Sequence, residues 1–315
     1  MSIGIPAAAG WRVLEQARWR EREARHHERA DALLAGHLER RRLGAAHPVE
    51  DFLFTYYSHK PGRLRRWHPG AGAVLLGEAA LDRLDRRWYR EFTVPDPRGG
   101  SARGVGLDAE AFYAERGATV DFVSALLRAV NARPAHLGCF GLHEWAMVYR
   151  LSPEQVRHAR VPLRLGSEGT DRVVESHRVH CSHYDAFRFF TPEARPLNRL
   201  RPTRRDQVDQ DQPGCLHATM DCYKWAYKLT PAVPGELVLD CFELARDVRE
   251  LDMRASPYDL SGHGYSPVRI ETAEGKAEYM AAQKEFAERG TALRSRLLEV
   301  CEALAGGPAR GGRSR

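Results

Sequence analysis

Residues 211–228 (DQPGCLHATMDCYKWAYK) constrain the fold most, because they carry an apolar stripe and a polar stripe at the same helical spacing. Pro213-Gly214 is a turn and breaker pair, and the pattern after it predicts a helix over about residues 214–229. One face of this helix carries Leu216, Met220, Tyr223 and Tyr227, and the neighbouring face carries His217, Asp221, Lys224 and Lys228. The sequence therefore predicts a helix that brings ionisable side chains into a packed core.

His217 and Asp221 stand four residues apart on this helix and project from one face of it. The spacing allows a hydrogen bond between the two side chains, or two ligands to one metal ion. A solvated helix rarely carries such a pair, which favours a polar site built into a helical core. The alternative is an ordinary His–Asp contact.

The composition is that of a globular protein. The chain has 315 residues, enough for one large domain or two, and its 43% hydrophobic content excludes a mainly disordered chain. It has no apolar run of about 18 residues and no basic-then-apolar leader, so we expect a soluble cytoplasmic protein without a membrane partner. Its six cysteines form no CxxC pair, which predicts reduced thiols rather than zinc-finger or iron–sulfur sites.

Arginine dominates the basic residues, since only five of the 48 are lysines in a chain of net charge +6. Arginine binds phosphate and stacks on aromatic rings better than lysine does. The charge therefore permits nucleic acid as a partner without demanding it. Five arginines lie in one proline-broken segment: Arg195, Arg199, Arg201, Arg204 and Arg205. This segment is either a phosphate clamp or a solvated loop.

The hydrophobic periodicity predicts a mainly α protein with a minor β component, folded as a single compact helical domain with a long charged N-terminal helix. Arginine alternates with Glu and Asp at helical spacing over residues 11–42. Further helices are expected at 111–130, 141–149, 235–250 and 271–304, extended segments within 71–98, and a long loop at 191–212. We assign a charged N-terminal helix to 1–45, the main helical domain to 46–305 and a flexible tail to 306–315.

Aromatic residues are interleaved with arginines in HPVEDFLFTYYSH (47–59) and LRRWHPG (64–70). These segments include Tyr57 and Trp67. Such a mixture suits stacking on a base and binding a phosphate. The alternative is a buried aromatic helix with a charged edge.

The segment GLHEWAMVY (141–149) begins as a zinc-protease motif does, but Met147 stands where the second histidine should be. A protease of that kind is therefore excluded. His143 and Glu144 point about 100° apart on a helix, which disfavours a shared metal ion. One of the two side chains at a site is a better prediction than both.

The segment SHRVHCSHYDAFRFF (176–190) carries three histidines within seven residues and fits either a helix or a strand. Its His180 and His183, joined by His217 and Asp221, would complete a two-histidine, one-carboxylate metal site or a denser one. A divalent ion of iron, zinc or manganese would suit these ligands.

No Gly-rich dinucleotide motif, Walker loop, GxSxG elbow or kinase signature is present, which excludes the common nucleotide-cofactor enzymes. The six segments HPVEDFLFTYYSH, LRRWHPG, GLHEWAMVY, SHYDAFRFFTPEA, DQPGCLHATMDCYKWAYKL and LDMRASPYDL together resemble a group of actinobacterial proteins catalogued as 3-methyladenine DNA glycosylases. The resemblance covers about residues 45–285. The chain lacks the Gly-rich hairpin and catalytic Asp of helix-hairpin-helix glycosylases, the Cys/His spacing of the zinc-containing ones, and HEAT-type repeats.

The resemblance implies hydrolysis of the N-glycosidic bond of an alkylated purine, with DNA as the partner. An N3-alkylated adenine is a cationic leaving group, so the reaction needs an aromatic pocket and a carboxylate near the anomeric carbon. The candidate catalytic carboxylates are Glu144, Asp185 and Asp221. The candidate substrate-binding residues are His183, His217, Tyr223, Trp225, Tyr57, Trp67, Arg199 and Arg204.

Two other functions remain open from the residues. One is a non-haem metal enzyme that acts on a small molecule through the His/Asp cluster. The other is a non-catalytic nucleic-acid-binding protein that uses the arginine segment, while the oligomeric state is left undetermined.

Polar residues on otherwise apolar helices and strands also predict that their side chains lie close together in the fold. A polar group buried without a partner costs about 1–3 kcal/mol, so such groups should meet one another. We predict that His183, His217 and Asp221 line one pocket with Tyr223 or Trp225 on its wall. A separation of the two imidazoles beyond about 12 Å, the width of one helix, would contradict it.

Overall fold

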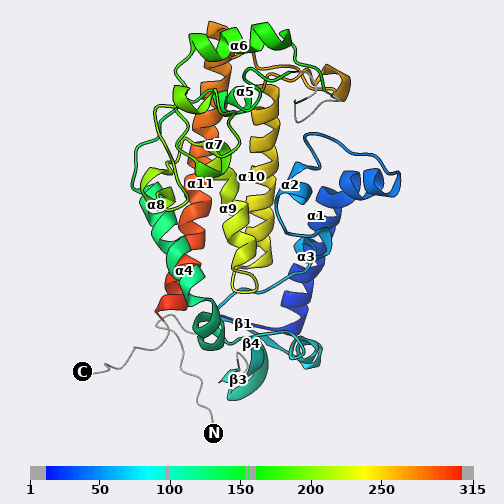
Figure 1. The fold of residues 1–315 in the computed structure, drawn as a ribbon. Coiled ribbons are helices and arrows are strands. Elements are labelled where there is room, and N and C mark those ends of the chain that lie inside the picture. The colour runs from blue at the N-terminus through cyan, green and yellow to red at the C-terminus, as the bar shows by residue number, and fades with distance from the viewer. Residues whose placement is uncertain (1–11, 97–98, 153–154, 156–160, 307–315) are drawn as a thin grey trace, which may run out of the picture.

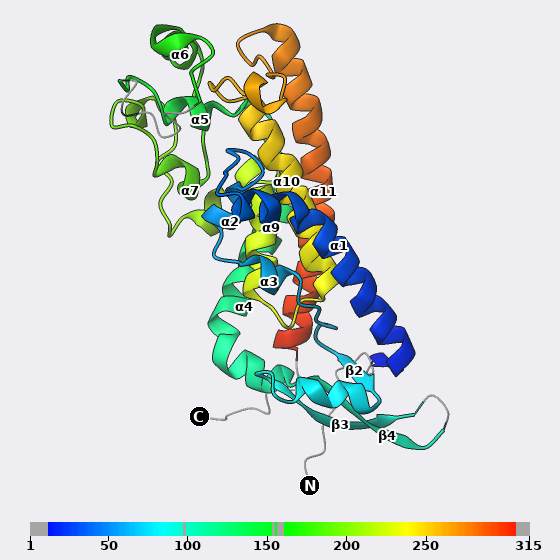
Figure 2. The same ribbon diagram turned by 90° about the vertical axis from the view of Figure 1, so that its right-hand side faces the viewer.

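Four helices that run side by side form the core of the protein (Figures 1 and 2). They are α4 (Ala109–Asn131), α9 (Leu216–Lys228), α10 (Gly235–Arg254) and α11 (Ala273–Ala305). The structure is a computed structural model that describes residues 12–96, 99–152, 155 and 161–306. The expected class, mainly α with a minor β component, is confirmed.

Helix α9 packs against both α10 and α11. Both of its stripes are largely covered: Met220 and Tyr223 are buried on the apolar side, and Asp221 is 3% exposed on the polar side. Two of the helices start at a side-chain cap. Asp108 accepts a hydrogen bond from the backbone of α4, and Thr272 does so for α11.

The predicted charged helix is α1 (Gln16–Arg42), which lies along α10 (Figure 2). Its Ala30 and Leu34 join the main hydrophobic core. Its exposed side carries most of its charges. The prediction of helix from residue 11 is wrong at its start. Arg12–Leu14 form strand β1 instead, since they pair with another strand.

A four-stranded sheet lies at one end of the helical bundle (Figure 1). Its order is β1 (Arg12–Leu14), β2 (Ala73–Leu76), β4 (Ser101–Leu107) and β3 (Tyr89–Pro95), with β1 and β2 parallel and the other pairs antiparallel. Strand β4 was not predicted, since extended segments were expected only within 71–98. A Cβ at Gly104 would lie 2.6 Å from the Val74 side chain, so the glycine permits close strand packing.

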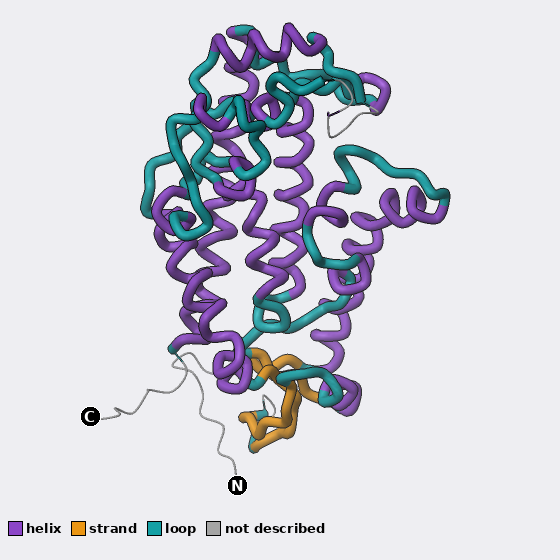
Figure 3. The backbone as a smooth tube through the Cα atoms, in the orientation of Figure 1, coloured by secondary structure: helices purple, strands orange, loops and turns teal. Residues whose placement is uncertain are grey.

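Short helices and loops cover the other end of the bundle (Figure 3). The short α-helices are α2 (Phe52–Tyr56), α3 (Pro61–Leu64), α5 (Leu142–Ala146), α6 (Gly166–Ser176), α7 (Tyr184–Phe187) and α8 (Gln207–Gln210). The 3₁₀ helices of the described residues are η1 (Glu78–Arg83), which packs against β4 of the sheet, η3 (Arg195–Leu197) and η4 (Ser261–His263). Residues 191–212 are mostly loop, as expected, whereas 176–190 contain the last residue of α6 and the four-residue α7. The expected tail, beyond Gly306, lies outside the described residues.

Candidate functional site

A cavity of about 480 Å³, here called the central cavity, lies where α2, α5, α7, α9 and α10 meet. Its ionisable lining residues are Glu144, Asp185, Arg188, His217 and Arg249. Its aromatic lining residues are Phe52, Tyr56, Phe189 and Tyr258. The cavity therefore combines flat apolar walls with both carboxylates and cations.

His217 enters this cavity from the first turn of α9 and is half-buried. Its ring lies edge-on to His143 at 4.4 Å and stacks on His183 at 5.5 Å, centroid to centroid. Burial lowers the pKa of His217 well below its usual value, and the neighbouring His143 lowers it further. Among the described residues, neither ring nitrogen of His217 has a hydrogen-bond partner. The side chain is thus held as a neutral imidazole.

A buried ion-pair cluster joins α5 to α10 beside His217. Arg249 Nη1 donates to Glu144 Oε1 at 3.0 Å and to Asp252 Oδ2 at 3.1 Å. The other oxygen of Asp252 lies 2.8 Å from His143 Nε2. Burial would lower the pKa of His143, but Asp252 raises it well above its usual value. Burial likewise would raise the pKa of Asp252, but His143 lowers it. The two therefore form an imidazolium–carboxylate pair.

A second cluster lies around Lys224 of α9. Its Nζ is 2.9 Å from Asp221 Oδ2 and 2.9 Å from Asp185 Oδ2. The hydroxyl of Tyr57 donates to the other Asp221 oxygen at 3.0 Å. Burial would lower the pKa of Lys224, but Asp221 and Asp185 raise it, which keeps the ammonium charged. Asp221 is thus fully engaged, whereas Asp185 also reaches the cavity.

His183 connects these groups to the loop before α9. Its Nδ1 lies 2.9 Å from Asp211 Oδ1, and its Nε2 lies 3.8 Å from Asp221 Oδ2. Burial would lower the pKa of His183, but Asp211 raises it. The two ring nitrogens of His183 therefore each face a carboxylate, while the flat face of the ring stacks on His217.

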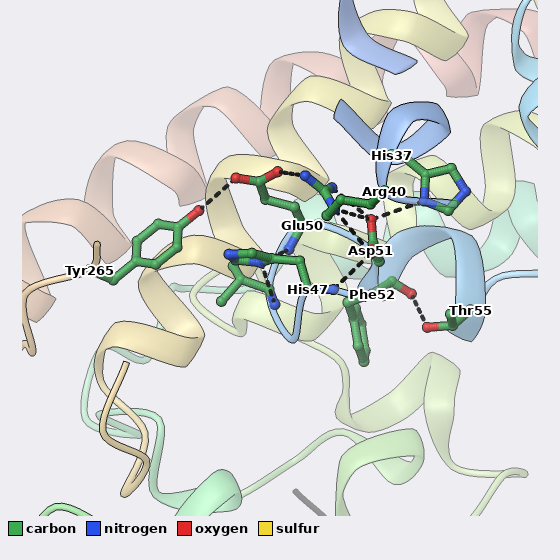
Figure 4. Close-up of polar contacts among 9 residues, drawn as sticks. His37, Arg40, His47, Glu50, Asp51, Phe52, Thr55 and Tyr265 are labelled. Atoms are coloured by element: carbon green, nitrogen blue, oxygen red, sulfur yellow. Dashed lines mark hydrogen bonds and ion pairs between the residues drawn. The ribbon is translucent and has the colours of Figure 1, made fainter. Parts of the chain in front are cut away.

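A polar network outside the cavity fixes the short helix α2 (Figure 4). Asp51, which precedes α2, accepts hydrogen bonds from Arg40 Nη2 at 2.7 Å and from the backbone of His47 at 2.8 Å, and contacts His37 Nδ1 at 2.9 Å. These bonds tie α2 to the end of α1. They set the position of Phe52, whose ring lies 3.8 Å from the guanidinium carbon of Arg249.

His183 lies near both other residues of the predicted pocket: its ring centroid is 5.5 Å from that of His217, and its Nε2 is 3.8 Å from Asp221 Oδ2. Of these three, only His217 lines the central cavity. The prediction that Tyr223 or Trp225 forms a wall of the pocket is wrong, since neither lines the central cavity. Tyr223 is fully buried and bonds to His59, and Trp225 packs against Phe122. Tyr223 points to another face of α9 than His217, and Trp225 lies about 12 Å further along the helix.

Other predicted site residues lie elsewhere. Trp67 stacks on Trp19 beside the sheet, with ring centroids 6.4 Å apart, and belongs to a separate hydrophobic cluster. His180 lines a second cavity and is not part of the cluster around His183. The chain between them belongs to no helix or strand, so no regular element holds the two side chains on one face. The proposed four-ligand set with His180 is therefore not assembled.

Arg249 was not singled out from the sequence, and Asp252 was expected in a compact turn rather than on α10. Both are buried on α10, at 2% and 1% exposure, among apolar neighbours such as Val248 and Leu251. A pair of opposite charges three residues apart within an apolar stripe was the available signal.

Two groups of three buried or half-buried side chains could hold a metal ion, with ligand atoms within 4.8 Å of one another. They are His143, His217 and Asp252, and His183, Asp185 and Asp221. The group of His143, His217 and Asp252 is poorly suited to a metal ion, because His143 and Asp252 already bond to each other and Arg249 bonds to Asp252. In the second, the Lys224 ammonium occupies the position of a cation between the two carboxylates.

Five exposed arginines, here called the arginine surface, lie in the segment between α7 and α8. They are Arg195, Arg199, Arg201, Arg204 and Arg205. Arg195 donates to the backbone carbonyl of Arg188, a residue that lines the cavity. Within the described part of the chain, none of the five pairs with a carboxylate. This contrasts with the many ion-paired arginines elsewhere, such as Arg29 and Arg164.

No helix in the described ranges is both long and apolar enough to cross a membrane. Comparison with known proteins finds no matching family model, no matching curated protein and no matching solved structure.

Proposed function

We propose that the protein hydrolyses the N-glycosidic bond of alkylated purines such as 3-methyladenine in DNA. One observation carries this proposal: a single cavity combines aromatic walls, carboxylates and a neutral imidazole, and Arg195 of the arginine surface bonds to Arg188 of its lining. The resemblance of the sequence motifs to proteins catalogued as glycosylases points the same way.

The size and lining of the central cavity suit a displaced nucleotide base. A volume of about 480 Å³ falls within the range of small-molecule pockets. Phe52, Tyr56, Phe189 and Tyr258 offer ring faces on which a flat cationic base can stack. An enzyme acting on a base in duplex DNA must rotate that base into such a pocket.

In this mechanism His217 is the general base and Glu144 the electrostatic group. His217 takes a proton from water, whose oxygen bonds to the anomeric carbon as the carbon–nitrogen bond breaks. The electron pair of that bond leaves with the alkylated base, which becomes neutral. Glu144 has one oxygen bonded to Arg249, and its other oxygen has no hydrogen-bond partner among the described residues. That oxygen stabilises the positive charge that develops on the sugar.

The other two predicted carboxylates have different roles in this proposal. Asp185 lines the cavity, but Lys224 and Arg188 neutralise it. Asp221 does not line the cavity and positions Lys224 and Tyr57. Glu144 is therefore the first carboxylate to test.

The direct test is base release. The purified protein, incubated with methylated duplex DNA, should release 3-methyladenine above a buffer control. A known glycosylase must release the base in parallel. No release under those conditions would refute the proposed activity.

The arginine surface makes a separate prediction about binding. Replacing Arg199 and Arg204 with Gln should weaken binding to duplex DNA and reduce the slope of log affinity against log salt by about 2, because each phosphate contact contributes about 0.9. Fluorescence anisotropy over a salt series measures both quantities.

The matched control replaces two exposed arginines on other faces, Arg42 and Arg128, and should leave the slope unchanged. Equal losses in both double variants would mean that only net charge matters. Binding that depends on Arg199 and Arg204 without base release would instead support a non-catalytic nucleic-acid-binding protein.

A metal-dependent enzyme is the second candidate, favoured by the close approach of His183, Asp185 and Asp221. Iron, zinc or manganese would have to displace the Lys224 ammonium from the two carboxylates. Elemental analysis of protein purified without chelator separates the two candidates. A stoichiometric metal, lost in the Asp221→Asn variant, would favour this alternative over metal-free hydrolysis.

A further inference from the structure

Cys139 differs from the other cysteines in its surroundings. All six are free thiols, and Cys181, Cys215, Cys222, Cys241 and Cys301 are buried. Cys139 is partly exposed and lines a second cavity of about 300 Å³, distinct from the central cavity. A small molecule in that cavity would therefore meet this thiol.

The thiol stands at the end of a cysteine–histidine–aspartate series. Cys139 Sγ lies 3.9 Å from His143 Nδ1, and His143 Nε2 lies 2.8 Å from Asp252 Oδ1. The second oxygen of Asp252 accepts from Arg249 at 3.1 Å. Both imidazole nitrogens are thus engaged, one with the thiol and one with a carboxylate that is itself held in place. Nucleophilic cysteines are activated by such an arrangement.

We propose that Cys139, with His143 and Asp252, is a nucleophilic thiol site for a small polar carbon electrophile that enters the second cavity. The site goes beyond the proposed base release and shares neither its cavity nor its general base. His143 is the group that holds the thiol proton, and Asp252 orients its ring.

A charged imidazole lies beside the thiol. Burial would lower the pKa of His143, but Asp252 raises it well above its usual value, so the ring carries a proton at neutral pH. A cationic imidazole beside a cysteine favours the thiolate, which is the nucleophile. The thiolate forms a sulfur–carbon bond as the bond to the leaving group breaks, and the leaving group departs with the electron pair. The thiol proton remains on His143.

The backbone also positions Cys139. Phe140 (φ +48°) and Gly141 (φ +67°) both adopt the left-handed conformation directly after it. This conformation is uncommon for a residue with a side chain. The resulting turn brings the carbonyl of Cys139 to 3.0 Å from the backbone nitrogen of Leu142 and leads into α5, which carries His143.

The second cavity suits a polar reactant rather than a lipid. Its other polar lining residues are Arg133, His136, His180, Ser182, Asp209, Gln210 and Gln212. His136 and His180 lie edge to face across it, with ring centroids 6.4 Å apart. An amide-bearing alkylating reagent such as iodoacetamide is therefore an appropriate probe.

The test is the alkylation rate of the native protein with iodoacetamide at slightly acid pH, where an ordinary thiol of pKa about 8.5 is mostly protonated. Intact-mass and peptide mass spectrometry should find one fast adduct per chain, at Cys139. Its rate constant should exceed that of N-acetylcysteine at least about tenfold. A rate at or below that of N-acetylcysteine, or a fast adduct on another cysteine, would overturn the proposal.

Variants then identify the activating group. Cys139→Ser should lose the fast adduct, and His143→Gln should slow Cys139 to the reference rate or below. Loosening of the fold would expose buried thiols and raise total labelling, so slower labelling reports lost activation. Cys215→Ala, which removes a nearby buried thiol, is the matched control and should keep the fast adduct. An unchanged rate in folded His143→Gln also overturns the proposal. If His143→Gln does not fold, the alkylation rate of Cys139 in the unmodified protein, compared with that of N-acetylcysteine, still tests the proposal.

Discussion

The His217→Asn variant should release 3-methyladenine from methylated DNA about 100- to 10,000-fold more slowly than the unmodified protein, the range typical for loss of a general base. Asparagine keeps a polar side chain in the cavity but cannot take a proton from water. His217 makes no hydrogen bond to a described residue, so its replacement leaves no buried partner unsatisfied. The fold and the affinity for DNA should therefore be retained. Single-turnover release and anisotropy measure the two effects separately.

The control is His27→Asn, on α1 and away from the cavity, which should release the base at the unmodified rate. A His217→Asn protein with undiminished release would place the base elsewhere, and Glu144 or Asp185 would be the next candidate. A loss of both release and DNA binding would instead indicate a structural role for His217.

The long helices could be predicted because their apolar periodicity extends over many residues. The pattern in α4 and α11 repeats through several turns, and propensity and packing agree along each helix. Strand β4 lacks such a signal, since Gly104 and Gly106 are selected by the close approach of β2 rather than by strand propensity. The short helix α7 contains four residues, too few for a period to be recognised, whereas α5 lies within the helix predicted over 141–149 but is shorter than predicted.

The polar stripe of α9 indicated a buried polar site, but it did not indicate which residues of other helices would contact that stripe. Asp252 and Arg249 come from α10, and no local pattern tells which helices will meet. The error over Tyr223 has a physical cause as well. The prediction assumed one core-facing side, whereas α9 packs against helices on more than one side, so its aromatic residues are buried away from the cavity.

The charges around the central cavity are matched within the protein itself. The carboxylates are Glu144, Asp185, Asp211, Asp221 and Asp252. Each has a cationic partner from the set His143, His183, Arg188, Lys224 and Arg249. Buried charges are tolerated when they are paired in this way. His217 stands out against this background as the neutral ionisable group of the cavity lining.

The largest effect on stability is expected from Arg249→Met. Arg249 is 2% exposed, contacts Glu144 and Asp252, and lies over the ring of Phe52. Methionine fills part of the volume but leaves two carboxylates without their shared cation. Removing one partner from a buried ion pair costs about 3–5 kcal/mol. The free energy of unfolding, obtained from urea denaturation, should fall by that amount.

Arg246→Met is the matched control on the same helix. Arg246 is half exposed, and its contact with Asp247 is 3.7 Å long, so the variant should change the free energy of unfolding by less than about 0.5 kcal/mol. Comparable losses in the two variants would show that α10 responds to any loss of positive charge, and would contradict a buried cluster held by Arg249. The double variant Arg249→Met with Glu144→Gln sharpens the test. Because it removes the cation and one of the two carboxylates together, it should recover part of the stability that Arg249→Met loses.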